Sequence, residues 1–216
     1  MSHVLDQLPD GLAARVVPAK PQLAGRAAEK PMLAVLGDRR QFDEQWLFER
    51  KLDGVRIIAV RSSDGVRLLS RGGLHRENTY PEVAEALSAQ PHGDFTVGGE
   101  IVPVRGGRSD FSLLQQRSGI TDPRAARANG ITVVYYVFDL LRLDGRDTTA
   151  LPLRYRKTLL RNAMTFRSPV RFPPHRNTWS EDLLPEACAS GWGADRQARG
   201  RSLRAAALDR LAEAEV

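Results

Sequence analysis

Lys51 is the residue of this chain whose type and surroundings best suit covalent chemistry. It lies in the run Glu49-Arg50-Lys51-Leu52-Asp53-Gly54-Val55-Arg56, among two acids and two further arginines. Only four of the 32 lysines and arginines are lysines, although arginine serves wherever just a positive surface charge is needed. A lysine retained in such a chain indicates chemistry that needs a neutral amine, which arginine cannot readily supply. The alternative is an ordinary β-turn with a solvated lysine.

Three further groups of residues are candidates to act beside that lysine. Arg71 is flanked by a serine and two glycines, so its guanidinium can approach a phosphate or ribose closely, or simply belong to a loop. Glu100 follows two glycines inside an apolar run, where a carboxylate faces either solvent or a site. Phe138 is a core residue or a base-stacking platform. Asp139, in the same apolar run, needs a partner or a metal ion if it is buried.

Short strands and helices that alternate irregularly must position these residues. Asp-Gly pairs between β-rich runs predict a hairpin turn at residues 64–65 and the close of the longest strand at 144–145. The predicted strands fall within 46–71, 95–104, 131–143 and 170–172. The predicted helices are 81–89, with Pro81 in its first turn, 111–117, capped by Ser109 or Asp110, 153–164 and 181–190. Hairpin-like links favour an α+β fold with antiparallel sheets over a doubly wound fold.

Length and composition indicate a soluble globular protein: 216 residues, 42% of them hydrophobic and 27% charged. No apolar run reaches the roughly 18 residues of a membrane span, and the first residues lack the pattern of a secretory leader. The single cysteine, Cys188, allows no internal disulfide, which suits the cytoplasm. The net charge of +6 favours a polyanionic partner. Residues 1–30, punctuated by proline and glycine, predict a flexible lead-in.

Taken in order, these motifs resemble those of the ATP-dependent DNA ligases, and most closely the bacterial ligases of end-joining repair. The resemblance extends from about Pro31 to Trp192. The matching segments are Lys51-Leu52-Asp53-Gly54-Val55-Arg56 (motif I), Ser70-Arg71-Gly72 (motif Ia), Gly99-Glu100 (motif III), Phe138-Asp139-Leu140-Leu141 (motif IIIa) and Phe111–Arg117, which is similar to F-x-x-L-Q-x-R. The resemblance implies a nucleotidyltransferase adenylation domain over residues 31–192, ATP-grasp-like, with antiparallel sheets flanked by helices.

The resemblance also implies a three-step reaction with ATP and Mg²⁺. Lys51 attacks the α-phosphate of ATP to give lysyl-AMP, the AMP moves to the 5′-phosphate of a nick, and the 3′-hydroxyl displaces it. The implied nucleotide ligands, besides Lys51, are Glu49 on the adenine side, Arg56 and Arg71 on phosphate or ribose, Glu100 on ribose or in support of the metal, and Phe138 stacked on adenine. Arg71 and Arg117 are the implied DNA contacts.

The implied partners are nicked double-stranded DNA, bound through its phosphates, and an end-binding repair protein. The expected protein is a monomer in the bacterial cytoplasm, associated with the nucleoid and not with a membrane. Two rival interpretations stay open. One is an RNA ligase or mRNA capping enzyme, which shares K-x-D-G, although the F-D-L-L and L-Q-x-R segments favour DNA. The other is a non-catalytic remnant that binds nucleotide or DNA.

The sequence departs from the family pattern at one internal position and at its end. Gly98 stands where the family usually has the acid of D-G-E, which weakens the expected support around Glu100. Motif IV, motif V and an OB-fold domain are not recognisable, and residues 193–216 form an atypical tail. One hypothesis is a frameshift, because codons for Asp195–Ala198 read one base later can encode Ile-Ala-Lys. The alternative is a genuine short variant with a helix over 203–214. Without motifs IV and V, we expect weak or no self-adenylation and poor solubility.

Overall fold

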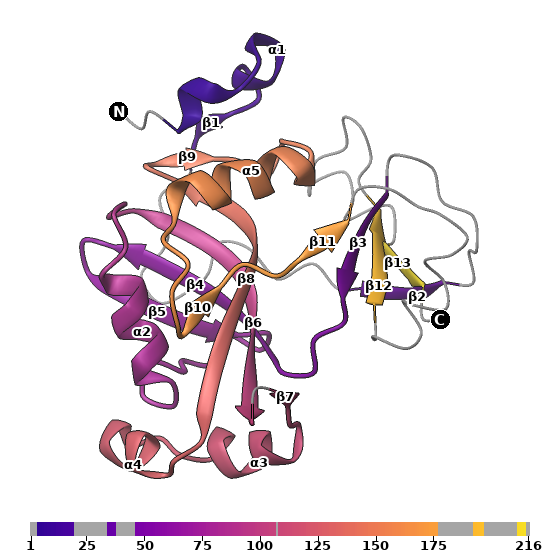
Figure 1. The fold of residues 1–216 in the computed structure, drawn as a ribbon. Coiled ribbons are helices and arrows are strands. Elements are labelled where there is room, and N and C mark those ends of the chain that lie inside the picture. The colour runs from indigo at the N-terminus through magenta and orange to yellow at the C-terminus, as the bar shows by residue number, and fades with distance from the viewer. Residues whose placement is uncertain are drawn as a thin grey trace.

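The computed structural model describes residues 4–19, 34–37, 46–106, 108–176, 192–196 and 211–214 (Figure 1). Within them, eight strands form a large sheet in the order β1-β9-β8-β6-β4-β5, with β10 added to β8 and β7 to β6. Their bounds are β1 Val17–Pro18, β4 Val55–Ser62, β5 Gly65–Ser70, β6 Phe95–Arg105, β7 Arg108–Ser109, β8 Thr132–Leu143, β9 Arg146–Asp147 and β10 Val170–Arg171. Every pairing is antiparallel except β10 with β8. The predicted α+β class with antiparallel pairing is confirmed for this sheet.

Two tight Asp-Gly turns set the register of this sheet. Gly65 has φ +107° and joins β4 to β5, so that Ser62 pairs with it directly. Asp144 and Gly145 have φ +47° and +74°, and they join β8 to β9. In this second turn both central residues have positive φ, the geometry that two-residue hairpins favour because its twist matches that of the strands. In the first turn the central residues are Ser63 and Asp64, and the positive φ falls on Gly65 at the start of β5. Both turns confirm the sequence prediction.

The helices are short, and most begin at a residue that the sequence marks. Their bounds are η1 Leu5–Gln7, α1 Asp10–Ala13, α2 Pro81–Ser88, α3 Ser112–Ser118, α4 Pro123–Ala128 and α5 Leu153–Ala163. The N-cap position of α3 is Phe111, which makes no side-chain cap bond; Asp110, one residue earlier, accepts a hydrogen bond from the Ser112 amide at 3.0 Å. Helix α4 is not predicted, because its six residues carry no apolar periodicity. The helix predicted over 181–190 lies outside the described residues.

The main core lies on one face of the large sheet, under α2 and α5. Alternate residues of β4 and β8, such as Ile57 and Val137, face it, and Leu87 of α2 and Leu160 of α5 pack against them. The opposite face holds a smaller apolar cluster of Ile58, Val60, Leu69 and Leu141. Arg56 of β4, Glu100 of β6 and Phe138 of β8 lie beyond this cluster, near the start of β4. This polar end of the sheet is where the candidate site lies.

Residues 4–19 pack against the body of the domain, in contrast to the flexible lead-in expected over 1–30. Val4 and Leu8 are buried in the main core, and Gln7 accepts a hydrogen bond from Asn162 of α5 at 2.6 Å. Strand β1 pairs with β9 beside them (Figure 1). The expectation is therefore wrong for this segment. Its prolines and glycines keep the elements short, but Val4 and Leu8, on either side of η1, still reach the main core.

Two smaller sheets lie to one side of the large one (Figure 1). Strand β3, Trp46–Arg50, pairs with β11, His175–Arg176, on one edge and with β12, Trp192–Arg196, on the other. Strand β2, Ala34–Gly37, pairs in parallel with β13, Leu211–Ala214. The helix expected over 203–214 is thus wrong for its last four residues. Among the described residues, no helix has the length and apolar character needed to cross a bilayer.

Candidate functional site

Lys51 follows β3 directly, in the link that carries the chain from the small sheet to β4 of the large one. Lys51 and Asp53 are exposed. The amide of Gly54 donates a hydrogen bond of 2.8 Å to Oε1 of Glu100 on β6. A Cβ at Gly54 would lie only 2.2 Å from the Ile101 carbonyl oxygen, so only glycine allows this approach. The link bearing Lys51 is therefore held against β6 at Glu100, which joins motifs I and III of the sequence analysis.

Strand register brings two site residues, Arg56 and Glu100, side by side across the sheet. Arg56 on β4 pairs with Glu100 on β6, which in turn pairs with Tyr136 on β8. The β6–β8 register shifts between Gly98 and Gly99, and such a bulge re-aims the side chains beside it. Next to the bulge, the Arg56 guanidinium lies 4.3 Å from the centroid of the Phe138 ring. Arg56 thus joins Glu100 and Phe138 in one polar-aromatic cluster.

Phe138 is half-buried and outside the main core, so the core interpretation is not supported for it. One face of its ring is available for a cation, and Arg56 lies over it at a distance typical of cation–π contacts. Nε of Arg56 is buried and has no hydrogen-bond partner among the described residues. An anion that reached this guanidinium would therefore satisfy a donor that the protein leaves unpaired.

The two glycines before Glu100 differ sharply in the space around them. A Cβ at Gly99 would lie 2.4 Å from the Tyr136 carbonyl oxygen and 2.5 Å from the Tyr135 ring, so a side chain is excluded there. A Cβ at Gly98 would meet its nearest neighbour, Cβ of Asp139, at an ordinary 3.6 Å. Gly98, where the family pattern has an acid, is thus not required by packing.

Asp139 is buried, and its partner is a cation of the protein. Its carboxylate accepts hydrogen bonds of 2.7 and 3.1 Å from Nε and Nη2 of Arg156 on α5. Arg156 also donates to the Leu151 carbonyl at 2.6 Å. Of the two alternatives that the sequence left open for a buried Asp139, a partner or a metal ion, the structure supports the partner.

Lys157, the next residue of α5, belongs to the site although the sequence did not indicate it. It is 2% exposed, and its Nζ donates 2.6 Å to Oε1 of Glu49 and 2.9 Å to the Phe138 carbonyl. The Phe172 ring lies 5.5 Å from the same nitrogen. Glu49, expected on the adenine side of a nucleotide, is thus half-buried and paired with a lysine from another element. The only sequence signal was the rarity of lysine itself.

His175 of β11 extends this cluster on the small sheet. It pairs in register with Glu49, and its ring meets Phe172 edge-on at 5.5 Å. Burial lowers the pKa of His175 below its ordinary value, and the nearby charge of Lys157 lowers it further. A neutral imidazole is therefore favoured here, so that Lys157 remains the cation facing Glu49.

Arg71 is exposed in the tight turn after β5. Gly73 has φ +78°, and its amide donates to the Ser70 carbonyl at 2.8 Å. Ser70 pairs with Ile57, so Arg71 lies at the edge of the sheet where β4 begins. The Lys51 link also enters the sheet at this end, just before β4. The pairing of β4 with β5 alone fixes this position of Arg71.

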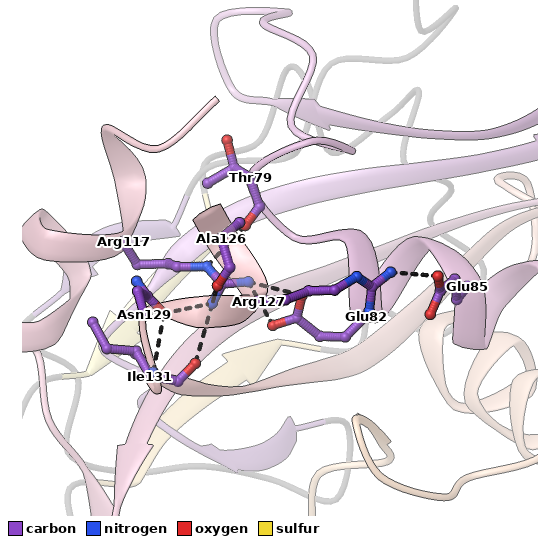
Figure 2. Close-up of polar contacts among 8 residues, drawn as sticks. All are labelled: Thr79, Glu82, Glu85, Arg117, Ala126, Arg127, Asn129 and Ile131. Atoms are coloured by element: carbon purple, nitrogen blue, oxygen red, sulfur yellow. Dashed lines mark hydrogen bonds and ion pairs between the residues drawn. The ribbon is translucent and has the colours of Figure 1, made fainter. Parts of the chain in front are cut away.

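Arg117 is not available to DNA, and the expectation that it binds DNA is corrected. It is 1% exposed and lies between α2, α3 and α4 (Figure 2). Its donors are used inside the protein: Nη2 binds both oxygens of Glu82 at 2.7 and 2.8 Å, and Nε binds the Thr79 carbonyl at 2.9 Å. Nη1 donates to the Ala126 carbonyl, to Asn129 Oδ1 at 2.9 Å and to the Ile131 carbonyl at 3.3 Å. Arg117 ties three helices together.

The donor set does not form a dedicated metal cage. Over the part of the chain that the structure describes, no three His, Cys, Asp or Glu side chains gather to hold an ion. Glu100, the expected metal residue, already accepts the Gly54 amide at Oε1. A single carboxylate nevertheless fits Mg²⁺, which usually keeps its waters and is held by one or two carboxylates plus substrate phosphates. The site fits an ion that arrives with a triphosphate.

Comparison with known proteins identifies the fold and the family. Residues 31–186 match the family model of the ATP dependent DNA ligase domain. The chain belongs to this family. It is 35% identical over 161 residues to the Bacillus subtilis bifunctional non-homologous end joining protein LigD, covering 71% of the chain and 26% of the relative. It is 31% identical over 184 residues to the Pseudomonas aeruginosa multifunctional LigD, covering 80% of the chain and 21% of the relative.

Solved ligase structures share its fold. A mycobacterial DNA ligase D, complexed with ATP and MES, superimposes with a TM-score of 0.62 at 27% identity over 81% of this chain and 56% of that one. The adenylated Chlorella virus DNA ligase matches at 20% identity with a TM-score of 0.52, over 88% of this chain and 69% of that one, which supports the fold alone. The chain thus spans about a quarter of the two end-joining relatives and about half of the mycobacterial ligase structure. The ligase family and adenylation-domain fold expected from the sequence are confirmed.

Proposed function

We propose that this ligase-family chain takes AMP from ATP onto Lys51, as the first step in sealing nicked DNA. The Nζ lone pair attacks the α-phosphorus, a P–N bond forms, the bond to pyrophosphate breaks, and the amine proton passes to solvent. The observation that carries this proposal is the Gly54–Glu100 hydrogen bond, which holds the Lys51 link beside the cluster of Arg56 and Phe138. A nucleophile, a cation and an aromatic ring at one sheet edge suit a nucleotide.

The other site residues take their roles from their positions. Arg56 and Arg71 bind the phosphates or ribose, Phe138 stacks on adenine, and Glu49 lies on the adenine side. Because Arg56 covers one face of the Phe138 ring at 4.3 Å, a base stacks on the other face or displaces the guanidinium. Glu100 supports the ribose or the ion while it holds Gly54. Mg²⁺ supplies charge neutralisation at the triphosphate and helps keep Lys51 deprotonated.

The proposed substrate is nicked duplex DNA, and the pathway is end-joining repair in the bacterial cytoplasm, at the nucleoid. The net charge of +6 suits a phosphate backbone, so binding is expected to weaken steeply with salt. The relatives named as non-homologous end joining proteins support the pathway. An end-binding repair protein is the proposed recruiting partner.

Mass spectrometry of the chain after incubation with ATP and MgCl₂ tests the proposal. The expected result is one adenylyl group on the peptide that contains Lys51, lost in Lys51→Arg. Lys20→Arg and Lys30→Arg are the matched controls, and both should keep the adduct. Even a low occupancy supports the proposal when it maps to Lys51. ATP binding with no adduct would instead favour a non-catalytic nucleotide-binding role. Sealing of nicked RNA in preference to nicked DNA would favour an RNA ligase.

A further inference from the structure

We propose that Lys157 is a positioning residue, which fixes the segment 49–54 so that Lys51 faces its substrate; this inference rests on the proposed function. The segment is anchored at both ends. Glu49 is held by Lys157, and the Gly54 amide is held by Glu100. Lys51 lies between the two anchors, on the link between the small and large sheets.

Lys157 joins its own helix, α5, to two strands. Its side chain starts from α5, and Nζ reaches Glu49 of β3 at 2.6 Å and the Phe138 carbonyl of β8 at 2.9 Å. The Phe138 and Phe172 rings lie 5.9 and 5.5 Å from Nζ. The ammonium therefore couples the strand before Lys51 directly to the helix and strand that carry the aromatic side of the site.

Burial makes this contact hard to exchange for water. Lys157 is 2% exposed, and an ammonium removed from water must keep its partners or lose its charge. The Glu49 side chain is 18% exposed, so it can rehydrate if the lysine is lost. Removing Lys157 is thus expected to release β3 at Glu49 more than to unfold the protein.

The release matters because Glu49 is only two residues before Lys51. Strand residues advance by about 3.3 Å each, so Lys51 lies within about 7 Å of Glu49 along the chain, and a shift of β3 at Glu49 also moves Lys51. A misplacement of about 1 Å can cost up to about a hundredfold in rate when a reaction depends on alignment. The predicted defect is therefore larger in the adenylation rate than in ATP affinity, which changes only through the adenine-side contacts of Glu49 and Phe138.

Arg156 offers a matched control in the same turn of α5. It is also 2% exposed and also pairs with a carboxylate, that of Asp139, at 2.7 Å. Its other bond goes to the Leu151 carbonyl at 2.6 Å. These partners belong to β8 and to the residues just before α5, and none belongs to segment 49–54. Losing Arg156 removes a buried cation without releasing β3.

The test compares Lys157→Met with Arg156→Met in the full chain. The readouts are the adenylation rate at saturating ATP, the ATP dissociation constant, and backbone hydrogen exchange of residues 46–54. Lys157→Met should lower the rate at least about tenfold, raise the ATP dissociation constant by a clearly smaller factor and speed exchange in 46–54. Arg156→Met should neither slow adenylation selectively nor speed exchange in residues 46–54, even if it lowers the melting temperature. Lys157→Gln, which keeps polar donors, serves if Lys157→Met does not fold.

The outcomes separate this inference from the proposed function. Equal effects of the two methionine variants on rate and exchange would overturn the positioning role, as would unchanged exchange in Lys157→Met. If the wild-type chain forms no adduct at Lys51, the proposed function fails, whereas exchange of residues 46–54 still decides whether Lys157 fixes the segment.

Discussion

Replacement of Arg117 by methionine should destabilise the protein without weakening its binding to DNA. The substitution removes the ion pair with Glu82 and the hydrogen bonds to the Thr79, Ala126 and Ile131 carbonyls (Figure 2). Methionine fills part of the volume but satisfies none of these acceptors. Three helices would lose the group that holds them together.

The loss of stability expected for Arg117→Met depends on how deeply Arg117 and Glu82 are each buried. Breaking a buried ion pair by removing one partner costs about 3–5 kcal/mol, because a charge is left uncompensated. Arg117 is 1% exposed, but the Glu82 side chain is 27% exposed and can recover water. We therefore expect the lower end, about 3 kcal/mol. For a protein of this size, that corresponds to a fall of about 6–12 °C in melting temperature.

Arg127 provides the control, because it pairs with Glu85 across the same helices (Figure 2). That pair is 45% and 68% exposed, so Arg127→Met should cost no more than about 1 kcal/mol. Thermal and urea denaturation measure both variants. Nicked-duplex affinity is measured as a function of salt, at a temperature where all the proteins are folded. Arg117→Met with wild-type stability, weaker DNA binding and a salt slope reduced by about one would refute the reasoning.

Three other results are expected. Gly99→Ala should lower stability by about 1–3 kcal/mol in urea denaturation because its Cβ meets backbone, whereas Gly98→Ala should be nearly neutral; similar costs would contradict the packing. Gly54→Ala should abolish adduct formation at Lys51 by moving its link off β6, while Gly93→Ala, with open space around it, keeps the adduct. Burial lowers the pKa of His175 in the folded state, so its contribution to stability is complete above pH 6.5 and declines as the pH falls below that value. Between pH 7.5 and 5.5, the free energy of unfolding should therefore fall less for His175→Asn than for the wild-type protein. An equal fall in both proteins would argue against a neutral imidazole.

Local chemistry explains which elements the sequence could predict. The turns at Gly65 and Gly145 depend on backbone conformations that few residues adopt, and α2 begins at a proline in its first turn. These signals act within a few residues. The packing of residues 4–19 depends instead on contacts with α5 and β9, which nothing within that segment announces. A segment rich in proline and glycine therefore predicts flexibility from its local pattern, although it packs.

The candidate site was predicted as residue types in order, but not as a set of partners. Register between β4 and β6 brings Arg56 and Glu100 side by side. Lys157 was missed because charged residues on an amphipathic helix are usually solvated, and its partner Glu49 lies 108 positions away. The same rule misplaced Arg117 on the surface, since its carboxylate partner comes from α2. Burial of a cation depends on where a distant acid lies.

The packing of residues 4–19 bears on how this domain should be cut for study. The family match begins at residue 31, yet Val4 and Leu8 fill space in the main core ahead of it. A fragment trimmed to the matched boundary would open a hole beside α5 and strip β9 of its neighbour β1. The unit that folds is thus longer than the unit that sequence comparison recognises, and expression designs should retain the preceding segment.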